Sequence, residues 1–326
     1  MRRLLRIESV LTVVVMFVVL VMGALVTVTG SGHGCSNTWP LCNGKVIPAF
    51  NGTPGAIAAL IEFSHRAATA LVSLLIFVLA GGTLFFYRQR REALILAPLM
   101  IVFLFAQAIL GAIAAGVHET PAVLALHFGV SLIAFATIVL TAAFLLEEPR
   151  ADRVRDRPTA LPLRWGIVGL LVFTYVVTYL GAYVVHSGAS LACADWPLCA
   201  KPAASVTSWF VLTQLIHRVA AALLVAGIAG LWLSTWRARA TRPDLFAGAT
   251  AALVSVALQA LAGGFVVLSR LGLISELLHA ALISLLFSSL CYMAYHLVPR
   301  RACLPARERA AVQSAPSRSA VPARAR

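Results

Sequence analysis

Long apolar stretches recur along the whole chain, and they constrain the fold more than any other feature of the sequence. Each stretch can cross the ~30 Å hydrocarbon core of a bilayer, because an α-helix rises ~1.5 Å per residue. Backbone polar groups inside a bilayer must be bonded within the protein, which favours helices. The eight expected spans are residues 7–29, 58–87, 93–116, 121–146, 163–185, 208–235, 245–268 and 273–297. We therefore predict an all-α integral membrane protein with eight transmembrane helices.

Composition supports this interpretation, since 60% of residues are hydrophobic and only 12% are charged, whereas soluble domains carry about 25% charged residues. The first span follows a short basic segment, as a signal peptide would. It is longer than a signal-peptide core, and no Ala-x-Ala-like cleavage site follows it. We expect it to be a retained helix.

The net charge of +14 could indicate nucleic-acid binding, but the basic residues are placed as the positive-inside rule requires. Of the 26 Lys and Arg residues, 21 fall before the first span, in the even-to-odd linkers or in the tail. We predict a multi-pass protein of the plasma membrane with both termini in the cytoplasm, contact with anionic lipid and no nucleic-acid partner. The basic tail, residues 300–326, is rich in Ala, Arg, Ser and Pro and is predicted to be disordered.

An internal repeat divides the chain. An offset of 152 residues relates His65-Arg66 to His217-Arg218, His127 to His279, and Gln107–Gly111 to Gln259–Gly263. An offset of 157 relates Trp39-Pro40-Leu41-Cys42 to Trp196-Pro197-Leu198-Cys199. Because each half has an even number of spans, both halves share one orientation, with a pseudo-two-fold axis along the membrane normal. We predict two pseudo-symmetric four-helix bundles, residues 1–150 and 151–299, followed by the tail.

Four histidines lie inside the expected spans at similar depth. His65 and His127 belong to the first half, His217 and His279 to the second, and the spacing is 62 residues in both. Two helices that each offer one imidazole at one depth are typical of bis-histidine haem ligation in a bundle. The alternatives are interhelical hydrogen bonding and zinc, but zinc needs three or four ligands and no third ligand recurs. The remaining histidines, His33, His118, His186 and His296, are expected to be interfacial polar residues.

Two cysteine pairs lie in the two long outer loops, where an oxidising environment lets disulfides persist. Cys35 and Cys42 belong to the first loop, and Cys193 and Cys199 to the other. Each pair closes a small ring, either as a structural staple or as a redox-active pair near a haem edge. Cys291 and Cys303 have no repeat partner.

The halves differ at one informative position. Glu62 precedes His65 by three residues, on the same helix face, and its repeat mate is Gln214. A carboxylate beside an intramembrane pocket can accept or donate a proton, whereas an amide cannot titrate. This difference assigns chemistry to the first half and a permanent cofactor to the second. Glu276, three residues before His279, has no acidic mate and its role stays open.

An arginine follows a histidine in both halves. Arg66 and Arg218 are candidate donors to haem propionates, which a guanidinium can bind through two hydrogen bonds, or to buried carboxylates.

These motifs together resemble the haem A synthase family over nearly the whole chain. The resemblance is carried by Gly30–Cys35, the Trp-Pro-Leu-Cys segment, Glu62–Arg66, His127 and the degenerate second copy. It implies an oxidoreductase that converts the ring methyl of haem O into a formyl group by successive hydroxylations, giving haem A for an aa-type terminal oxidase.

The resemblance also implies roles for individual residues. His65 and His127 would bind the substrate haem, His217 and His279 would ligate a resident haem b, and Glu62 would be catalytic. Cys35 and Cys42 match a functionally important loop pair of the family, and Cys193 and Cys199 match the second loop pair. A haem O synthase and terminal oxidase assembly factors are candidate partners.

Two rival functions explain parts of the same pattern. A di-haem membrane electron carrier, a quinol-linked cytochrome b, accounts equally well for the four histidines but not for the difference between Glu62 and Gln214. A transporter with parallel repeats predicts broken helices, and the spans contain no clear broken pair.

Overall fold

A computed structural model of the chain describes residues 1–36, 38, 41–49, 51–116, 120–147, 154–200 and 208–299. The predicted disordered tail, His118, Cys303 and the Trp39-Pro40 dipeptide lie outside the described residues. Within those ranges the long regular elements are helices, and Cys42 and Lys45 form an isolated extended bridge.

Eight helices of the described residues are long and apolar enough to cross a membrane, which confirms the predicted all-α membrane fold. They are α1 (Arg2–Val28), α2 (Pro54–Tyr87), α3 (Arg91–Gly116), α4 (Pro121–Leu146), α6 (Leu161–His186), α7 (Ser208–Arg237), α8 (Pro243–Leu268) and α9 (Leu273–His296). A short 3-10 helix, η1 (Ser31–His33), follows α1.

Some helices extend beyond the apolar stretches that predicted them. Helix α2 begins at Pro54 rather than at residue 58, because the Thr53 side chain accepts a hydrogen bond from the Ala56 amide and proline fits the first helical turn. The same Thr-Pro start, at Thr120 and Pro121, begins α4. Local capping chemistry therefore sets these boundaries.

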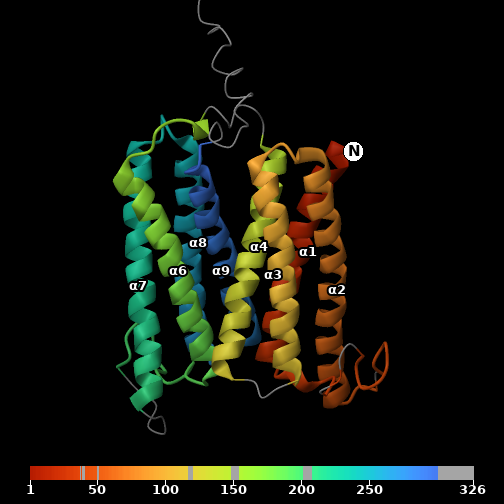
Figure 1. Cartoon of the computed structure of the whole chain (residues 1–326). Coiled ribbons are helices and arrows are strands. Elements are labelled where there is room, and N and C mark those ends of the chain that lie inside the picture. Colours follow the sequence, from red (N-terminus) through yellow and green to blue (C-terminus); the bar gives the residue numbers. More distant parts are fainter. Residues whose placement is uncertain are drawn as a thin grey trace, which may run out of the picture.

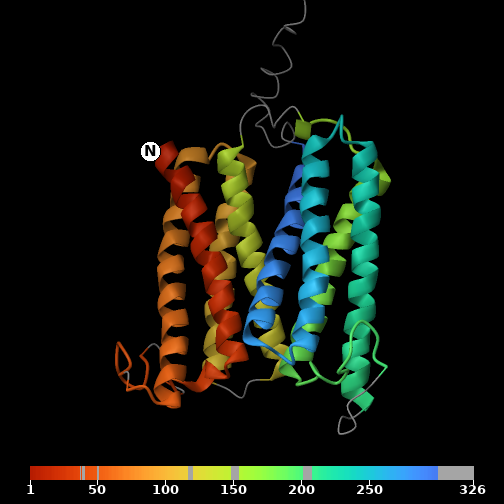
Figure 2. The same cartoon turned by 180° about the vertical axis from the view of Figure 1, so that it is seen from behind.

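Helices α1 to α4 lie on one side of the molecule and α6 to α9 on the other, in both views (Figures 1 and 2). The same neighbours pack in each half: α1 with α2, α2 with α3, α3 with α4 and α1 with α4; then α6 with α7, α7 with α8, α8 with α9 and α6 with α9. The end of the bundle with η1 and the cysteine loops is called the disulfide end. The opposite end, with Met1 and the last turn of α9, is called the terminal end (Figure 1).

Helix α4 is the centre of the contact between the two sides. It packs against α6 and α9, and α1 also packs against α9. In the most apolar stretch of α4, 67% of residues are buried inside the protein. The corresponding share is 39% in α9, the next most buried helix. Each side has its own apolar cluster, and α4 contributes Leu132 to one and Phe135 to the other.

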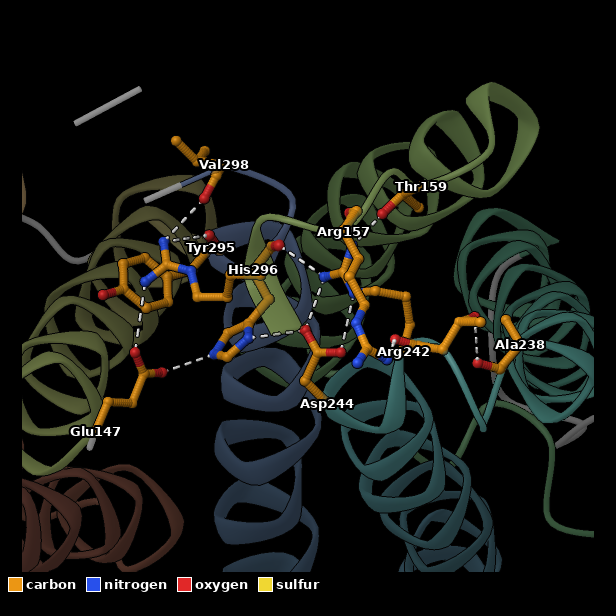
Figure 3. Close-up of polar contacts among 11 residues, drawn as sticks. Glu147, Arg157, Thr159, Ala238, Arg242, Asp244, Tyr295, His296 and Val298 are labelled. Carbon is orange, nitrogen blue, oxygen red and sulfur yellow. Dashed lines mark hydrogen bonds and ion pairs between the residues drawn. The ribbon is translucent and has the colours of Figure 1, made fainter. Parts of the chain in front are cut away.

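A buried polar group at the terminal end also joins the two sides (Figure 3). This terminal-end cluster consists of Glu147, Arg155, Arg242, Asp244 and His296. Glu147 follows the last residue of α4, while His296 ends α9. Arg155 lies between α4 and α6, and Arg242 and Asp244 lie at the start of α8.

The His296 imidazole is 1% exposed and bridges two carboxylates. Its Nε2 lies 2.7 Å from Oε1 of Glu147, and its Nδ1 lies 3.0 Å from Oδ2 of Asp244. Carboxylates only accept hydrogen bonds, so both ring nitrogens donate when both acids are ionised. Arg242 binds the Asp244 carboxylate through two nitrogens, at 3.0 and 2.7 Å. The sequence prediction of an interfacial polar residue missed this buried bridge.

Candidate functional site

The structure brings the four predicted histidines together as two pairs, one in each half. His65 on α2 lies near His127 on α4, and His217 on α7 lies near His279 on α9. Among the described helices, α2 does not pack closely on α4, nor α7 on α9. The paired histidines thus come from helices that lie diagonally across each bundle, so a ligand between them would lie inside the bundle.

A glycine on the preceding helix faces each of the four imidazoles. A methyl group added to the glycine would lie 3.2 Å from Cε1 of the histidine for Gly23 and His65, 3.7 Å for Gly111 and His127, 2.8 Å for Gly181 and His217, and 3.0 Å for Gly263 and His279. The last two contacts are too close for an alanine without movement of the ring. Each imidazole therefore packs against bare backbone, which leaves its other side toward the bundle interior.

Each of the four imidazoles also has one ring nitrogen that no described residue bonds. In all four, Nδ1 is buried and lacks a hydrogen-bond partner among the described residues. No group of three or more His, Cys, Asp or Glu side chains in the described part of the chain could hold a metal ion. Two imidazoles paired inside a bundle would suit a haem, because the porphyrin supplies four ligands and the protein needs to supply only two.

Glu62 lies next to this arrangement in the first half and is only 5% exposed. Its Oε2 accepts a hydrogen bond from the backbone amide of Cys35 at 2.8 Å, and its Oε1 accepts one from Nη2 of Arg66. The predicted acidic residue therefore connects helix α2 to the loop that contains the first disulfide.

Gln214 makes the corresponding contact in the second half. Its Oε1 accepts a hydrogen bond from the backbone amide of Cys193 at 2.6 Å, and its Nε2 donates to the carbonyl of Ser190 at 2.6 Å. The carboxamide therefore anchors the second loop as the carboxylate anchors the first, and it adds one donor of its own.

The two predicted propionate partners bind loop carbonyls. Nη1 of Arg66 donates to Thr38 at 2.7 Å. Arg218 donates to Cys193 at 3.1 Å, Pro197 at 3.2 Å and Leu198 at 3.1 Å. Each arginine thus holds the outer loop against the helix that carries the histidine, and pairing with a propionate stays a prediction.

Both predicted disulfides are present. Cys35 is bonded to Cys42, and Cys193 to Cys199. Cys35, Cys42 and Cys193 are fully buried or nearly so. Cys291, in α9, is a free thiol. Glu276 lies half-buried in the first turn of α9.

Two features of the site were not predicted from the sequence. The glycines Gly23 and Gly181 lie directly against the rings of His65 and His217, but no polar residue marks them. His186, expected to be interfacial, ends α6, which packs against the helix α4 that carries His127. Only the repeat could have pointed to the glycines, because they lie at similar places in both halves.

Comparison with known proteins identifies the family. A family model described as "COX15-CtaA: Cytochrome oxidase assembly protein" matches residues 6–291. Proteins named "Heme A synthase" from Bacillus cereus (strain G9842), Bacillus mycoides (strain KBAB4) and Bacillus anthracis (strain CDC 684 / NRRL 3495) are each 38% identical to this chain over 293 residues. Each alignment covers 90% of this chain and 93% of the relative.

The matched region contains all four paired histidines, Glu62 and both disulfides. The similarity inferred from the motifs is thereby confirmed: the chain belongs to the COX15-CtaA family of cytochrome oxidase assembly proteins, whose relatives here are haem A synthases.

Proposed function

We propose that this protein is a haem A synthase: a membrane oxidoreductase that converts the ring methyl of haem O to a formyl group by successive hydroxylations. The observation that supports this most directly is the pairing of four half-buried histidines inside the helices with one asymmetric carboxylate, Glu62, whose counterpart is Gln214. The product, haem A, would serve an aa-type terminal oxidase.

The second half, residues 151–299, would hold a resident haem b between His217 and His279. Both imidazoles are packed tightly against glycines, at Gly181 and Gly263, and a fixed ligand set suits a permanent cofactor. When bound, a bis-histidine haem supplies electron transfer. The protein's contribution is to hold both rings in place and to keep water out of the bundle.

The first half, residues 1–150, would hold the substrate haem between His65 and His127. Glu62 precedes His65 by three residues on α2, so its carboxylate can exchange protons with the reacting edge of the substrate. Its hydrogen bond with the Cys35 amide fixes the carboxylate, and thereby links the reacting side of the pocket to the first disulfide.

The proposed orientation of the protein in the membrane follows from the positions of its basic residues. The terminal end would face the cytoplasm, with both termini and the basic linkers, and the disulfide end would face outward. The substrate is then bound near the outer face of the plasma membrane, beside loops in an oxidising compartment. The two halves would be related by a pseudo-two-fold axis, in accord with their matching helix contacts. A haem O synthase and terminal oxidase assembly factors are the proposed partners.

Pigment extraction tests the function. The full-length protein is expressed with and without a haem O source, and the haems are extracted and separated. We expect haem b in both preparations and haem A only with the haem O source, provided that Glu62 is intact. Recovery of haem b with unchanged haem O would instead support the di-haem electron carrier.

A further inference from the structure

The second outer loop places Trp196 against helix α8, and the proposed function gives this indole no role. A methyl group added to Gly264 would lie 3.0 Å from Cδ2 and 3.0 Å from Cε2 of the indole, so the ring packs directly on bare backbone. Gly264 is buried, while Trp196 is 42% exposed. The indole therefore covers α8 close to the end of that helix at Leu268.

This contact lies beside the second histidine pair. Gly263, the residue before Gly264, packs against the ring of His279, and a methyl group added there would lie 3.0 Å from Cε1 of the imidazole. Successive residues of an α-helix are about 100° apart around its axis, because a turn has 3.6 residues. Helix α8 thus presents one glycine to the imidazole on α9 and the next glycine to Trp196.

Helix geometry places the indole at the seam between α7 and α8. Phe246 and Gly264 are separated by about five full turns of α8, so both lie on one face of the helix. The Phe246 ring contacts Trp232 and Trp236 of α7, with 6.1 and 5.6 Å between ring centroids. Gly264 therefore belongs to the face of α8 that packs against α7, and Trp196 covers this seam at the disulfide end.

The loop that carries Trp196 is fixed to α7 on both sides of His217. Gln214, three residues before the histidine, accepts a hydrogen bond from the loop amide of Cys193 at 2.6 Å. Arg218, the next residue after the histidine, donates to the carbonyl of the residue that follows Trp196 at 3.2 Å. These bonds act in addition to the disulfide. The loop therefore spans from the helix that carries one histidine of the pair to the helix that contacts the other.

The first half differs at the position that accepts the indole. The repeat offset of 152 residues relates Gly263 to Gly111, another glycine, but it relates Gly264 to Ala112 on α3. Ala112 is exposed, whereas Gly264 is buried. The Ala112 methyl group would crowd an indole placed in the same way. The glycine that faces the histidine is thus present in both halves, and the glycine that faces the loop is present only in the half assigned to a permanent cofactor.

We propose that Trp196 retains the haem of the second half by closing the seam between α7 and α8, and that Gly264 provides the contact surface for this closure. The proposal rests on the proposed function, in which His217 and His279 hold a permanent haem b. Opening the seam exposes the large apolar surface of a packed tryptophan to water, which is unfavourable. The first half must admit a substrate and release a product, so a closure of this kind would slow its turnover.

A purely structural role of Trp196 is the rival explanation. An indole that only stabilises the loop would change the melting temperature of the protein but not the rate at which haem leaves it. An indole that retains the haem would change that rate, while the spectrum of the bound haem, which the two histidines determine, stays the same. The rate of haem release therefore separates the two roles.

The experiment measures transfer of haem b from the purified full-length protein to an excess of apomyoglobin, followed by absorbance. Wild type is compared with Trp196→Ala, Trp196→Phe, Gly264→Val and the matched first-half variant Ala112→Val, and each melting temperature is recorded. We expect Trp196→Ala to release haem b about 10- to 30-fold faster, the usual effect of truncating a packed tryptophan at an interface. Gly264→Val should act in the same direction, because its side chain displaces the indole. Trp196→Phe should recover most of the retention, and Ala112→Val should match wild type.

Three results would contradict this account. Equal release rates in wild type and Trp196→Ala would overturn the proposal, and a lower melting temperature with those equal rates would favour the structural role. Equally fast release from Gly264→Val and Ala112→Val would also overturn it, because the effect would not depend on the surface beneath the indole. A wild-type protein without a bis-histidine haem b spectrum would contradict the proposed function itself, independently of Trp196.

Discussion

The two halves perform the same anchoring task with different chemistry at one position. In the first half a carboxylate, Glu62, accepts the amide hydrogen of Cys35, while in the second half a carboxamide, Gln214, accepts that of Cys193. Both side chains are buried, at 5% and 4% exposure. The contact distances, 2.8 and 2.6 Å, are equivalent.

The comparison of Glu62 with Gln214 separates the role of anchoring a loop from the role of exchanging protons. The second half shows that a neutral amide is sufficient to hold a disulfide loop against the histidine helix. A buried carboxylate costs more to desolvate than an amide, so its presence at position 62 needs another explanation. Gln214 lacks two properties of Glu62: the ion pair with Arg66 and the ability to exchange a proton. Proton exchange is the property that chemistry on a substrate would use.

The largest expected effect separates the two haem sites. Replacing His217 or His279 by Ala should remove the haem b signal entirely, since each is proposed to supply one of the two protein ligands. Replacing His65 by Ala should leave that signal in place. The measurement is the reduced-minus-oxidised spectrum of equal amounts of purified protein, and a preserved signal in the His217 or His279 variants would reverse the assignment of halves.

The next largest effect on turnover is expected from substitution of Glu62. Glu62→Gln should lower turnover by about 10²- to 10⁴-fold, the usual contribution of general acid–base catalysis, and should leave haem b intact. The reciprocal Gln214→Glu should lower turnover less than tenfold, because its loop keeps an acceptor. Haem A formed per minute is the readout. If Glu62→Gln also loses haem b, Glu62 has a structural role.

A smaller effect distinguishes the two disulfides. Replacing Cys35 and Cys42 by Ala should lower turnover about tenfold, because that loop donates the amide hydrogen bond to Glu62. The same change at Cys193 and Cys199 should leave turnover within about two-fold, since the proposed function gives Gln214 an anchoring role and assigns catalysis to Glu62. Both variants should lose about 2–4 kcal/mol of stability. Equal losses of turnover in the two variants would show that both disulfides have only a structural role.

The smallest effect on turnover is expected at the terminal-end cluster. His296→Ala leaves the carboxylates of Glu147 and Asp244 without their shared donor. Breaking a buried ionic pair costs about 3–5 kcal/mol, so the melting temperature should fall while turnover per folded molecule stays near wild type. Arg239→Ala, at an exposed site of the same end, is the control. An unchanged melting temperature would show that the cluster does not join the halves.

The sequence predicts the eight membrane spans, the histidine pairs and the two-half repeat, because each of them can be recognised from residue types and their spacing along the chain. Span length follows from hydrophobicity, and the offset of 152 residues identifies His65, His127, His217 and His279 together. The amide contact that makes Glu62 and Gln214 comparable could not be predicted, because it depends on how a loop folds back on a helix.

Side-chain contacts between helices could not be predicted from the sequence either. Gly23 and Gly181 look like ordinary small residues of a span until the structure places an imidazole against each. His296 has no repeat mate that could have indicated a role, since position 144 is Phe. Its partners come from two separate segments of the chain, Glu147 after α4 and Arg242 with Asp244 at the start of α8, which only the fold brings together.

The most direct test of the central claim is an experimental structure of the Glu62→Gln protein, purified after expression with a haem O source. The substitution should trap the substrate without removing its ligands. We predict haem b between His217 and His279, and haem O between His65 and His127 with its ring methyl near position 62. The same haem in both halves, or haem O between His217 and His279, would contradict the division of labour between the two halves.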